Sequence, residues 1–468
     1  MAPPDQRPDD HSDDDPLAAL FGGSVPPEMR EALESMGLGD LDPDTVRQMQ
    51  TQVQAMMSST DDSPINEELA HDTARAVVAQ HGDASIGEST RADVRQVVQV
   101  ANLWLDAVTD LAPAEGVGTA LSRAEWVEAT LPVWRSLTLP VAEGVRTALT
   151  GAMRDQLAEL GDAGTDSGTP IALPGVPPGM NPAALMGQME PMMRRMSGAM
   201  FGAQVGQAVG TLAGEIVSGT EVGLPLLPGQ TVAIVPANVS AFADGLQVDA
   251  GEVHLYLAVR EAARVRLFAG VPWLGPQLLS AVQDYARDIR IDTDAVEEAV
   301  RSASPGDAAA MQEALSGSMF SPEPSPAQRA ALTRLETYLA LVEGWVDVVC
   351  DRACTDHLPH VAALSEAVRR RRASGGPAEK VFASLVGLEL RPRRLRDAAN
   401  LWSAVESAHG AQARDEAWAH PDLAPTASDL DDPLGYVERR GTSSADDRDS
   451  ALTAELERML QDGGEPSG

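Results

Sequence analysis

The chain has few residues of the kinds on which small secreted domains and β-rich folds depend. Aromatic residues make up 4% of its 468 residues, and there are two cysteines, Cys350 and Cys354. Two cysteines do not imply a disulfide framework, so a reducing, cytoplasmic location is expected. The scarcity of aromatics in a sequence dominated by alanine and leucine favours packed helices over a β-sandwich or a barrel.

Positive charge is also scarce. Lysine and arginine together number 35 against 70 aspartates and glutamates, which gives a formal net charge of −35. A chain this acidic is repelled by nucleic acids and by anionic membrane surfaces, so we expect no nucleic-acid partner. The opening stretch, MAPPDQRPDDHSDDDP, lacks the basic region and the apolar run of a signal peptide.

Changes in composition along the chain predict five segments. Acidic tails are expected at 1–25 and at 426–468, the first disordered and the second mostly so. Between them lie a helical region at 26–160 and a larger helical domain at 183–425. A Gly/Pro-rich stretch at 161–182 is expected to link the two regions.

One predicted helix, 186–217, carries glycine at every fourth position. These glycines are Gly198, Gly202, Gly206, Gly210 and Gly214. In a membrane this spacing is typical of helix dimerisation, but Gln204, Gln207 and Glu215 interrupt the run and make it a poor span. We therefore expect close packing against another helix within a soluble core, and no membrane span.

A mainly α fold with one small β element is the resulting expectation. The stretch 224–246 breaks the helical rhythm with prolines and β-branched residues and predicts one or two short strands. A helix at 250–268 follows it, because Asp249 and Glu252 have the spacing of a capping box.

That helix carries Arg260-Glu261-Ala-Ala-Arg264, which has the spacing of the zinc-protease motif H-E-x-x-H. In that motif two neutral imidazoles four residues apart hold Zn²⁺, and the glutamate takes a proton from the bound water. Arginine cannot replace histidine there, because its guanidinium has donors only and stays protonated. Two arginines at the ligand positions would repel the ion.

Several stretches resemble one protein family. They are SRAEWVEATLPVWR (122–135), MSGAMFGAQVGQAVGTLAGEIVSGTEVGLPL (196–226), LYLAVREAARVRLFAGVPWL (255–274) and RRRRASGGPAEKVFASLVGLELRPRRLRDAANLW (369–402). From about residue 16 to 438 the chain resembles the actinobacterial zinc-dependent metalloprotease-like proteins, also called zincin-like hydrolases. The resemblance implies a zincin-like multi-helix domain. One branch, associated by name with biosynthesis of a deazaflavin coenzyme, keeps H-E-x-x-H; the branch that this chain resembles more often reads R-E-x-x-H.

The resemblance also suggests a third ligand position. Intact relatives have an E-G-H pattern in a later helix, where this chain reads Glu343-Gly344-Trp345. Asp347 lies four residues after Glu343, on the same helical face. We hypothesise that the guanidiniums of Arg260 and Arg264 take the place of the cation and pair with Glu343, with Asp347 or with both. In the alternative, the arginines extend to solvent or pair locally with acids such as Glu261.

Other groupings of polar residues have simpler interpretations. Cys350, Cys354 and His357 share a helical face, but their spacing matches no zinc finger, and small buried cysteines are the usual case. His254 lies seven residues before Glu261 and is expected to be packed rather than to act as a ligand. The arginines at 369–372 form a basic run that is expected to be solvated, with an acidic partner or the chain's own acidic tail as the alternative.

These features predict a family member without catalytic zinc. No cofactor is expected, although intact relatives hold zinc, and Glu261 is a vestigial general base at most. The chain would then act as a pseudo-enzyme that binds a protein, a peptide or a small ligand. Two alternatives remain: a metal-dependent hydrolase with a non-standard site on Glu261, Glu343 and Asp347, and a structural protein whose cleft is filled.

Overall fold

The computed structural model describes residues 62–166, 182–289, 324–373, 377–388 and 394–441. The chain divides into two units, Met1–Ser63 and Pro64–Gly468, and every described helix and strand lies in the second. The expected N-terminal tail falls outside the described residues.

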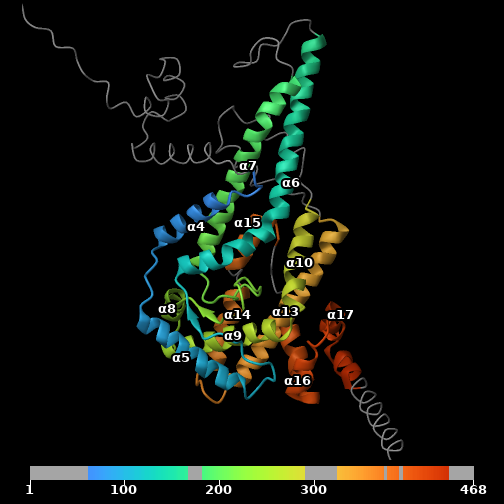
Figure 1. Cartoon of the computed structure of the whole chain (residues 1–468). Helices are drawn as coiled ribbons and strands as arrows, with labels where there is room; N and C mark the ends of the chain where they lie inside the picture. The colour runs from blue at the N-terminus through green and yellow to red at the C-terminus, as the bar shows by residue number, and fades with distance from the viewer. Residues whose placement is uncertain (1–61, 167–181, 290–323, 374–376, 389–393, 442–468) are drawn as a thin grey trace, which may run out of the picture. The chain divides into compact units, whose positions relative to one another are not determined.

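The second unit is built mainly from helices (Figure 1). Their bounds are α4 Glu67–His81, α5 Glu88–Leu105, α6 Arg123–Asp166, α7 Pro182–Ala213, α8 Pro236–Asp244, α9 Ala250–Gly270, α10 Leu274–Arg287, α13 Pro326–Cys354, α14 Val361–Ala373, α15 Pro377–Val386, α16 Leu395–Glu416 and α17 Ala427–Asp431, with a 3₁₀ turn at Pro421–Leu423. The prediction of a mainly α fold is confirmed.

A two-stranded parallel sheet accompanies the helices. Strand β2, Ala233–Ile234, lies in the stretch where the sequence predicted strands, and it precedes the motif helix α9. Its partner β1, Thr119–Ala120, pairs with it residue for residue. The position of β1 was not predicted, because a strand of two residues is too short to show the alternation of apolar and polar residues that indicates a strand. An isolated antiparallel bridge between Ser218 and Ile234 joins the segment that follows α7 to the same strand.

The glycine stripe on α7 packs against α4, as expected. A Cβ atom at Gly206 or Gly210 would collide with a backbone carbonyl oxygen of α4, and one at Gly202 with that of its N-cap, Asn66. The glycines therefore let the two backbones approach more closely than side chains would allow. At the N-terminal end of α4, the amide of Asn66 donates to the carbonyl of Gly198 at 2.9 Å. Close packing offsets the poor helix propensity of glycine.

Helix α9 is the centre of the unit and extends slightly further than predicted. Every residue from Tyr256 to Leu267 is buried, because α5, α8, α13 and α14 pack around it. Asp249 caps its first turn, accepting from the amides of Gly251 and Glu252. Glu252 does not complete the expected capping box; its carboxylate instead contacts the ring of His360, at 3.0 Å.

Helices from both sides of the predicted 161–182 linker pack within the same unit. Helix α4 packs on α7, α5 packs on α9, and α6 runs beside α7 (Figure 1). Part of the expected C-terminal tail is helical, and Leu430 and Tyr436 are buried there.

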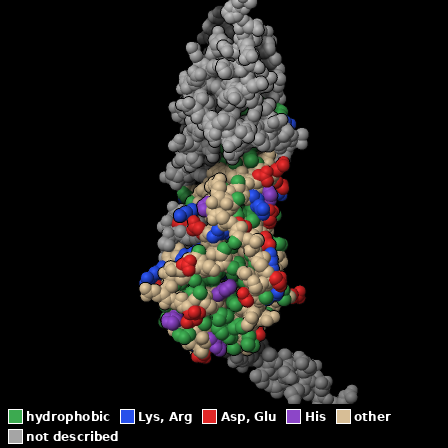
Figure 2. Space-filling model, turned by 90° about the vertical axis from the view of Figure 1, so that its left-hand side faces the viewer, with side chains coloured by type: hydrophobic (Ala, Val, Ile, Leu, Met, Phe, Trp, Pro, Cys, Tyr) green, Lys and Arg blue, Asp and Glu red, His purple; other side chains and the backbone are tan. Residues whose placement is uncertain are grey.

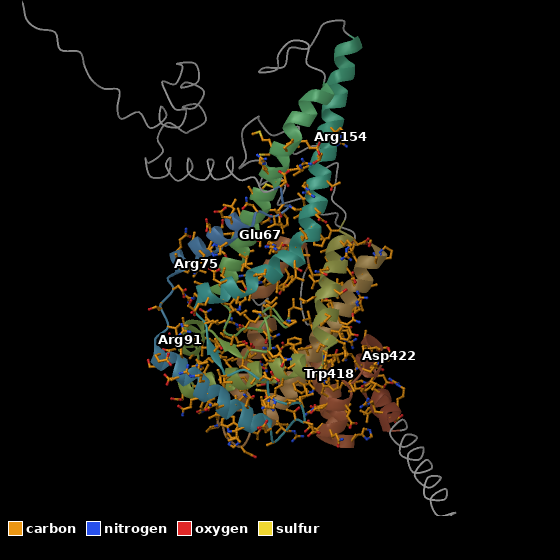
Figure 3. All side chains as sticks on the ribbon, in the orientation of Figure 1. Glu67, Arg75, Arg91, Arg154, Trp418 and Asp422 are labelled. Atoms are coloured by element: carbon orange, nitrogen blue, oxygen red, sulfur yellow. The ribbon has the colours of Figure 1, made fainter. Side chains whose placement is uncertain are left out.

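Tryptophan side chains pack together where α10 meets α16. Trp418, labelled in Figure 3, follows α16, and its backbone oxygen accepts from the indole of Trp273 at the start of α10. Its ring centroid lies 5.2 Å from that of Trp402 on α16. Trp126 and Trp134 are fully buried in the core.

One face of the second unit carries both signs of charge. On the face shown in Figure 2, acidic and basic side chains lie interspersed among hydrophobic and polar ones. Among the described residues, no helix combines the length and the apolarity that a membrane crossing requires.

The close contact of α4 and α7 can be tested by adding a side chain. Gly206→Val should lower the free energy of unfolding by about 3 kcal/mol, because its side chain overpacks a backbone-to-backbone contact. The neighbouring Gln207 is exposed, so Gln207→Val should change stability by less than about 0.5 kcal/mol. Urea unfolding followed by circular dichroism measures both. Equal midpoints for the two variants would contradict the packing argument.

Candidate functional site

Two buried helices bring charged residues face to face. Arg260 and Arg264 lie one turn apart on α9, and Glu343 and Asp347 lie one turn apart on α13. All four side chains are at most 4% exposed. A spacing of four residues places each pair on one helical face, and the packing of α9 against α13 turns the two faces toward each other.

The four residues form a connected ion network. Nη1 of Arg260 donates to Asp347 at 2.5 Å and its Nη2 to Glu343 at 3.2 Å. Nε of Arg264 donates to the other oxygen of Glu343 at 3.0 Å. Glu343 thus lies between the two guanidiniums. The expected pairing of both arginines with the acids of the later helix is observed.

The alternative, local pairing of an arginine with Glu261, is observed as well. Arg264 also donates to Glu261, at 3.0 Å, so it joins the motif glutamate to Glu343. Both oxygens of Glu261 accept further bonds, from the amide of Thr220 at 2.9 Å and from the hydroxyls of Ser218 and Thr220 at 2.7 and 2.8 Å. Neither arginine extends to solvent.

The bonds to Glu261 leave little room for base chemistry. Burial raises the pKa of the Glu261 carboxyl, while Arg264, Ser218 and Thr220 act in the opposite direction. The side chain is fully buried and its two oxygens hold four hydrogen bonds. A general base needs a substrate or a water within hydrogen-bond reach of a carboxylate oxygen, and here the chain itself occupies those positions.

Helix α14 adds three arginines from the basic run. Arg369 donates to Asp347 at 2.9 Å, and Arg372 lies 3.0 Å from Glu343. Arg371 pairs with Glu221 at 3.1 Å, and its guanidinium lies over the ring of Phe242.

The expectation of a solvated arginine run is therefore wrong for these three. Only Arg370 projects outward, with 78% of its side chain exposed. Arg369 and Arg372 are three residues apart, so they share one face of α14, and that face lies against the buried acids.

Trp345 is not part of this network. Its indole donates to Asp415 at 2.9 Å, and the guanidinium of Arg414 lies 5.6 Å from its ring centre. Trp345 is two residues from both Glu343 and Asp347, which turns it to the opposite side of α13, toward α16. The structure does not bring this proposed ligand position near Arg260 and Arg264.

Two cysteines and two histidines were the other residues considered as ligands. The sulfurs of Cys350 and Cys354 are 4.0 Å apart and buried, and His357 stacks on Trp104. His254 is two turns before Glu261, and burial lowers its pKa. Within the described ranges, no three His, Cys, Asp or Glu side chains are grouped so that they could hold a metal ion.

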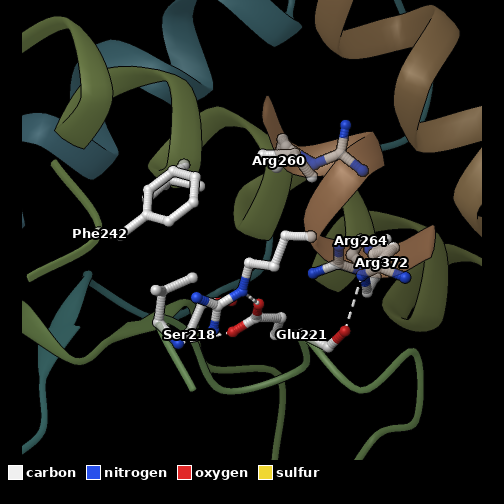
Figure 4. Close-up of a pocket in the computed structure, with 10 residues that line it drawn as sticks. Ser218, Glu221, Phe242, Arg260, Arg264 and Arg372 are labelled. Carbon is white, nitrogen blue, oxygen red and sulfur yellow. Dashed lines mark hydrogen bonds and ion pairs between the residues drawn. The ribbon is translucent and has the colours of Figure 1, made fainter. Parts of the chain in front are cut away.

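A small cavity opens beside the network (Figure 4). Its volume is about 20 Å³, enough for about one water molecule. Its lining includes Arg260, Arg264, Arg371, Arg372 and Glu221. A peptide does not fit into a space of this size.

Electrostatics set the protonation of the central acid. Burial alone would raise the pKa of Glu343, but the charges of Arg264, Arg372 and Arg260 lower it to about 2. Glu343 is therefore ionised at neutral pH. A buried charge costs several kcal/mol unless it is paired, and three guanidiniums supply the pairing.

Neutralising Glu343 should destabilise the protein. Glu343→Gln should lower the free energy of unfolding by about 3–5 kcal/mol, because it leaves buried guanidiniums without their counter-charge. Glu366→Gln is the matched control, since Glu366 makes an exposed pair with Arg370 on α14, and it should leave the urea midpoint unchanged. A midpoint for Glu343→Gln equal to that of the control would contradict the role of the network.

The same glutamate should make stability depend on pH. Its pKa in the folded chain is about 2, below an unfolded value of about 4.3. A lowered pKa contributes stability that is present above the unfolded value and is lost as pH falls toward 2. The stability gap between the wild type and Glu343→Gln should therefore narrow from pH 6 to pH 3. Urea unfolding at both values measures the gap, and a constant gap would contradict the assignment.

One family model and one solved structure resemble this chain. The family model described as zincin-like metallopeptidase matches residues 65–437. A crystal structure of a candidate hydrolase with a novel fold from Chloroflexus aurantiacus superimposes with a TM-score of 0.53 at 16% identity. The superposition covers 80% of this chain and 98% of that one, and it shows a shared fold. No curated protein sequence matches.

The family match includes α4 through α16, and with them the motif helix and the facing acids of α13. The chain belongs to the zincin-like metallopeptidase family.

Proposed function

We propose that this chain is a non-catalytic member of its family, a pseudo-enzyme that keeps the zincin-like scaffold and acts by binding a partner. The observation that carries the proposal is the position of two guanidiniums, those of Arg260 and Arg264, at the ligand positions of the zinc motif and in contact with Glu343. We also assign the chain to the actinobacterial branch with a degenerate motif, on the resemblance of its sequence, and expect a cytoplasmic location.

The residues present do not fit a zinc ion. Zinc in catalytic sites is held by lone pairs on nitrogen, sulfur or oxygen, commonly two histidines and a carboxylate. The guanidiniums offer no lone pair and carry positive charge of their own. They donate to the carboxylates that a cation would need, so a metal ion would have to displace a set of buried ion pairs.

A metal site made of carboxylates alone has less support. The alternative hydrolase would use Glu261, Glu343 and Asp347, with Mg²⁺, Ca²⁺ or Mn²⁺. Arg264 lies between Glu261 and Glu343 and donates to both, and Arg260 lies between Glu343 and Asp347. Each pair of acids is thus bridged by a guanidinium in the place where it would have to share a cation.

The decisive variant restores the imidazoles. The double variant Arg260→His, Arg264→His should bind about one zinc ion per chain, because two histidines one turn apart with Glu343 between them form the His₂Glu ligand set of known zinc enzymes. The double variant keeps Trp345, because this residue lies on the side of α13 that contacts α16. Zinc is measured by mass spectrometry after gel filtration.

The control removes the guanidiniums without supplying ligands. Arg260→Ala, Arg264→Ala should bind no zinc under the same conditions. If the double-histidine variant keeps its circular dichroism spectrum but takes up no more zinc than the alanine control, then Arg260 and Arg264 do not stand at metal-ligand positions and the proposal fails.

A further inference from the structure

A second, larger cavity borders the loop that holds Glu261. Thr220, whose amide donates to Glu261 at 2.9 Å, is one of the residues that line it. Its volume is about 210 Å³, against about 20 Å³ for the cavity lined by arginines. An apolar cavity of about 150 Å³ is large enough to hold one benzene molecule. The larger cavity therefore has room for a six-membered ring with a small substituent.

Three parts of the chain build the walls of this cavity. Val265 and Phe268 lie three residues apart on α9, so they share one face of that helix. Gly275 and Leu279 come from α10, and Pro225 comes from the loop before β2. A Cβ atom at Gly275 would lie 3.2 Å from Cγ of Pro225, so a glycine there lets the loop approach α10 closely. The packing of backbone segments thus sets the shape of the cavity.

The lining of the cavity favours a neutral ligand. Among the described residues that line it, none carries a charge, although 22% of the whole chain is charged. An ion that entered would lose its water without gaining a counter-charge, which costs free energy. Apart from Thr220, the polar side chains of the lining are those of Gln230, which is exposed, and Thr231. They offer hydrogen-bonding groups to one polar substituent of a ligand.

Rings in the wall favour a ring in the ligand. The lining includes the aromatic ring of Phe268 and the rings of three prolines, Pro225, Pro272 and Pro276. Aromatic rings attract one another in edge-to-face and offset arrangements. Proline rings also pack on aromatic surfaces, and this contact is used wherever proline-rich segments bind aromatic-lined grooves. An aromatic ligand therefore matches these walls better than an aliphatic one of equal size.

The opening of the cavity favours a free molecule over a peptide. Pro272 and Pro276 are exposed and line the cavity. Proline has no backbone N–H, whereas an extended peptide is held largely by hydrogen bonds to the main chain of its receptor. These two positions can donate no such bond.

We propose that this cavity binds a small neutral molecule with a single aromatic ring and one polar substituent, such as a phenol. The inference goes beyond the proposed function, which assigns no ligand. It also concerns another site, because Arg260 and Arg264 do not line this cavity.

The experiment titrates the full chain with p-cresol at pH 7, where a phenol with a pKa of about 10 is neutral. Methyl NMR follows Leu227, Val265 and Leu279, which line the cavity, and saturable shifts are expected there. No saturable binding of p-cresol to the wild type would refute the inference.

Three further probes test the class of ligand. p-Toluate, which is charged, should bind about tenfold more weakly or worse, because the lining holds no counter-charge. 4-Methylcyclohexanol, which is not aromatic, should bind about threefold more weakly. N-Acetyltyrosinamide carries the ring of p-cresol on a peptide backbone and should bind about fivefold more weakly, since the prolines give that backbone no donors. An affinity equal to that of p-cresol, for any of the three, would overturn the corresponding part of the assignment.

A pair of variants on α10 locates the site. Leu279→Trp should abolish p-cresol binding, because the larger side chain fills the cavity that Leu279 lines. Ser280→Trp is the matched control: Ser280 is the next residue, is exposed and does not line the cavity, so the affinity should not change. Equal affinities in the two variants would contradict the location.

An enlarged cavity guards against a trivial loss of folding. Leu279→Ala should raise the affinity for 2-naphthol relative to p-cresol about fivefold, because the truncated side chain leaves room for a second ring. A merely structural role for Leu279 would not change this ratio, and an unchanged ratio would refute the inference. Neither result bears on zinc uptake by the double-histidine variant, so failure here is distinct from failure of the proposed function.

Discussion

The structure around the motif helix depends on the pairing of Arg260 and Arg264 with Glu343 and Asp347. These side chains lie in the core, where an unpaired charge would cost several kcal/mol. Helix α9 can be buried on all sides only because α13 offers carboxylates at the same spacing of one turn, and because α14 adds Arg369 and Arg372 to complete them. The arrangement keeps helices α9, α13 and α14 together by charge where a metalloenzyme would use a metal ion.

Much of the fold follows from local patterns. The glycine spacing of α7 predicted a close helix contact, and the contact with α4 is present because no side chain separates the backbones at Gly202, Gly206 and Gly210. The cap at Asp249 predicted the start of α9. The pairing of β1 with β2 was beyond reach, since two-residue strands owe their position to the helices around them and have no pattern of their own.

The site was only partly predictable. The spacing of Arg260, Arg264, Glu343 and Asp347 suggested their pairing, because residues four apart share a face. The same rule argued against Trp345, which is two residues from each acid and faces Asp415 instead. The inward face of α14 was missed, although the interval of three between Arg369 and Arg372 was a usable signal. Ser218, Thr220 and Glu221 gave none, since they lie in a loop whose path depends on the small sheet.

Under the proposed function, binding remains when the metal chemistry is removed. At the positions where the motif would hold a cation, two guanidiniums pair with a buried carboxylate instead. The central claim is most directly tested by the metal content of the native, unmodified protein, purified without chelators and analysed by mass spectrometry. We predict that the native protein holds no stoichiometric transition metal. About one zinc ion per chain, bound beside Glu261, would contradict it.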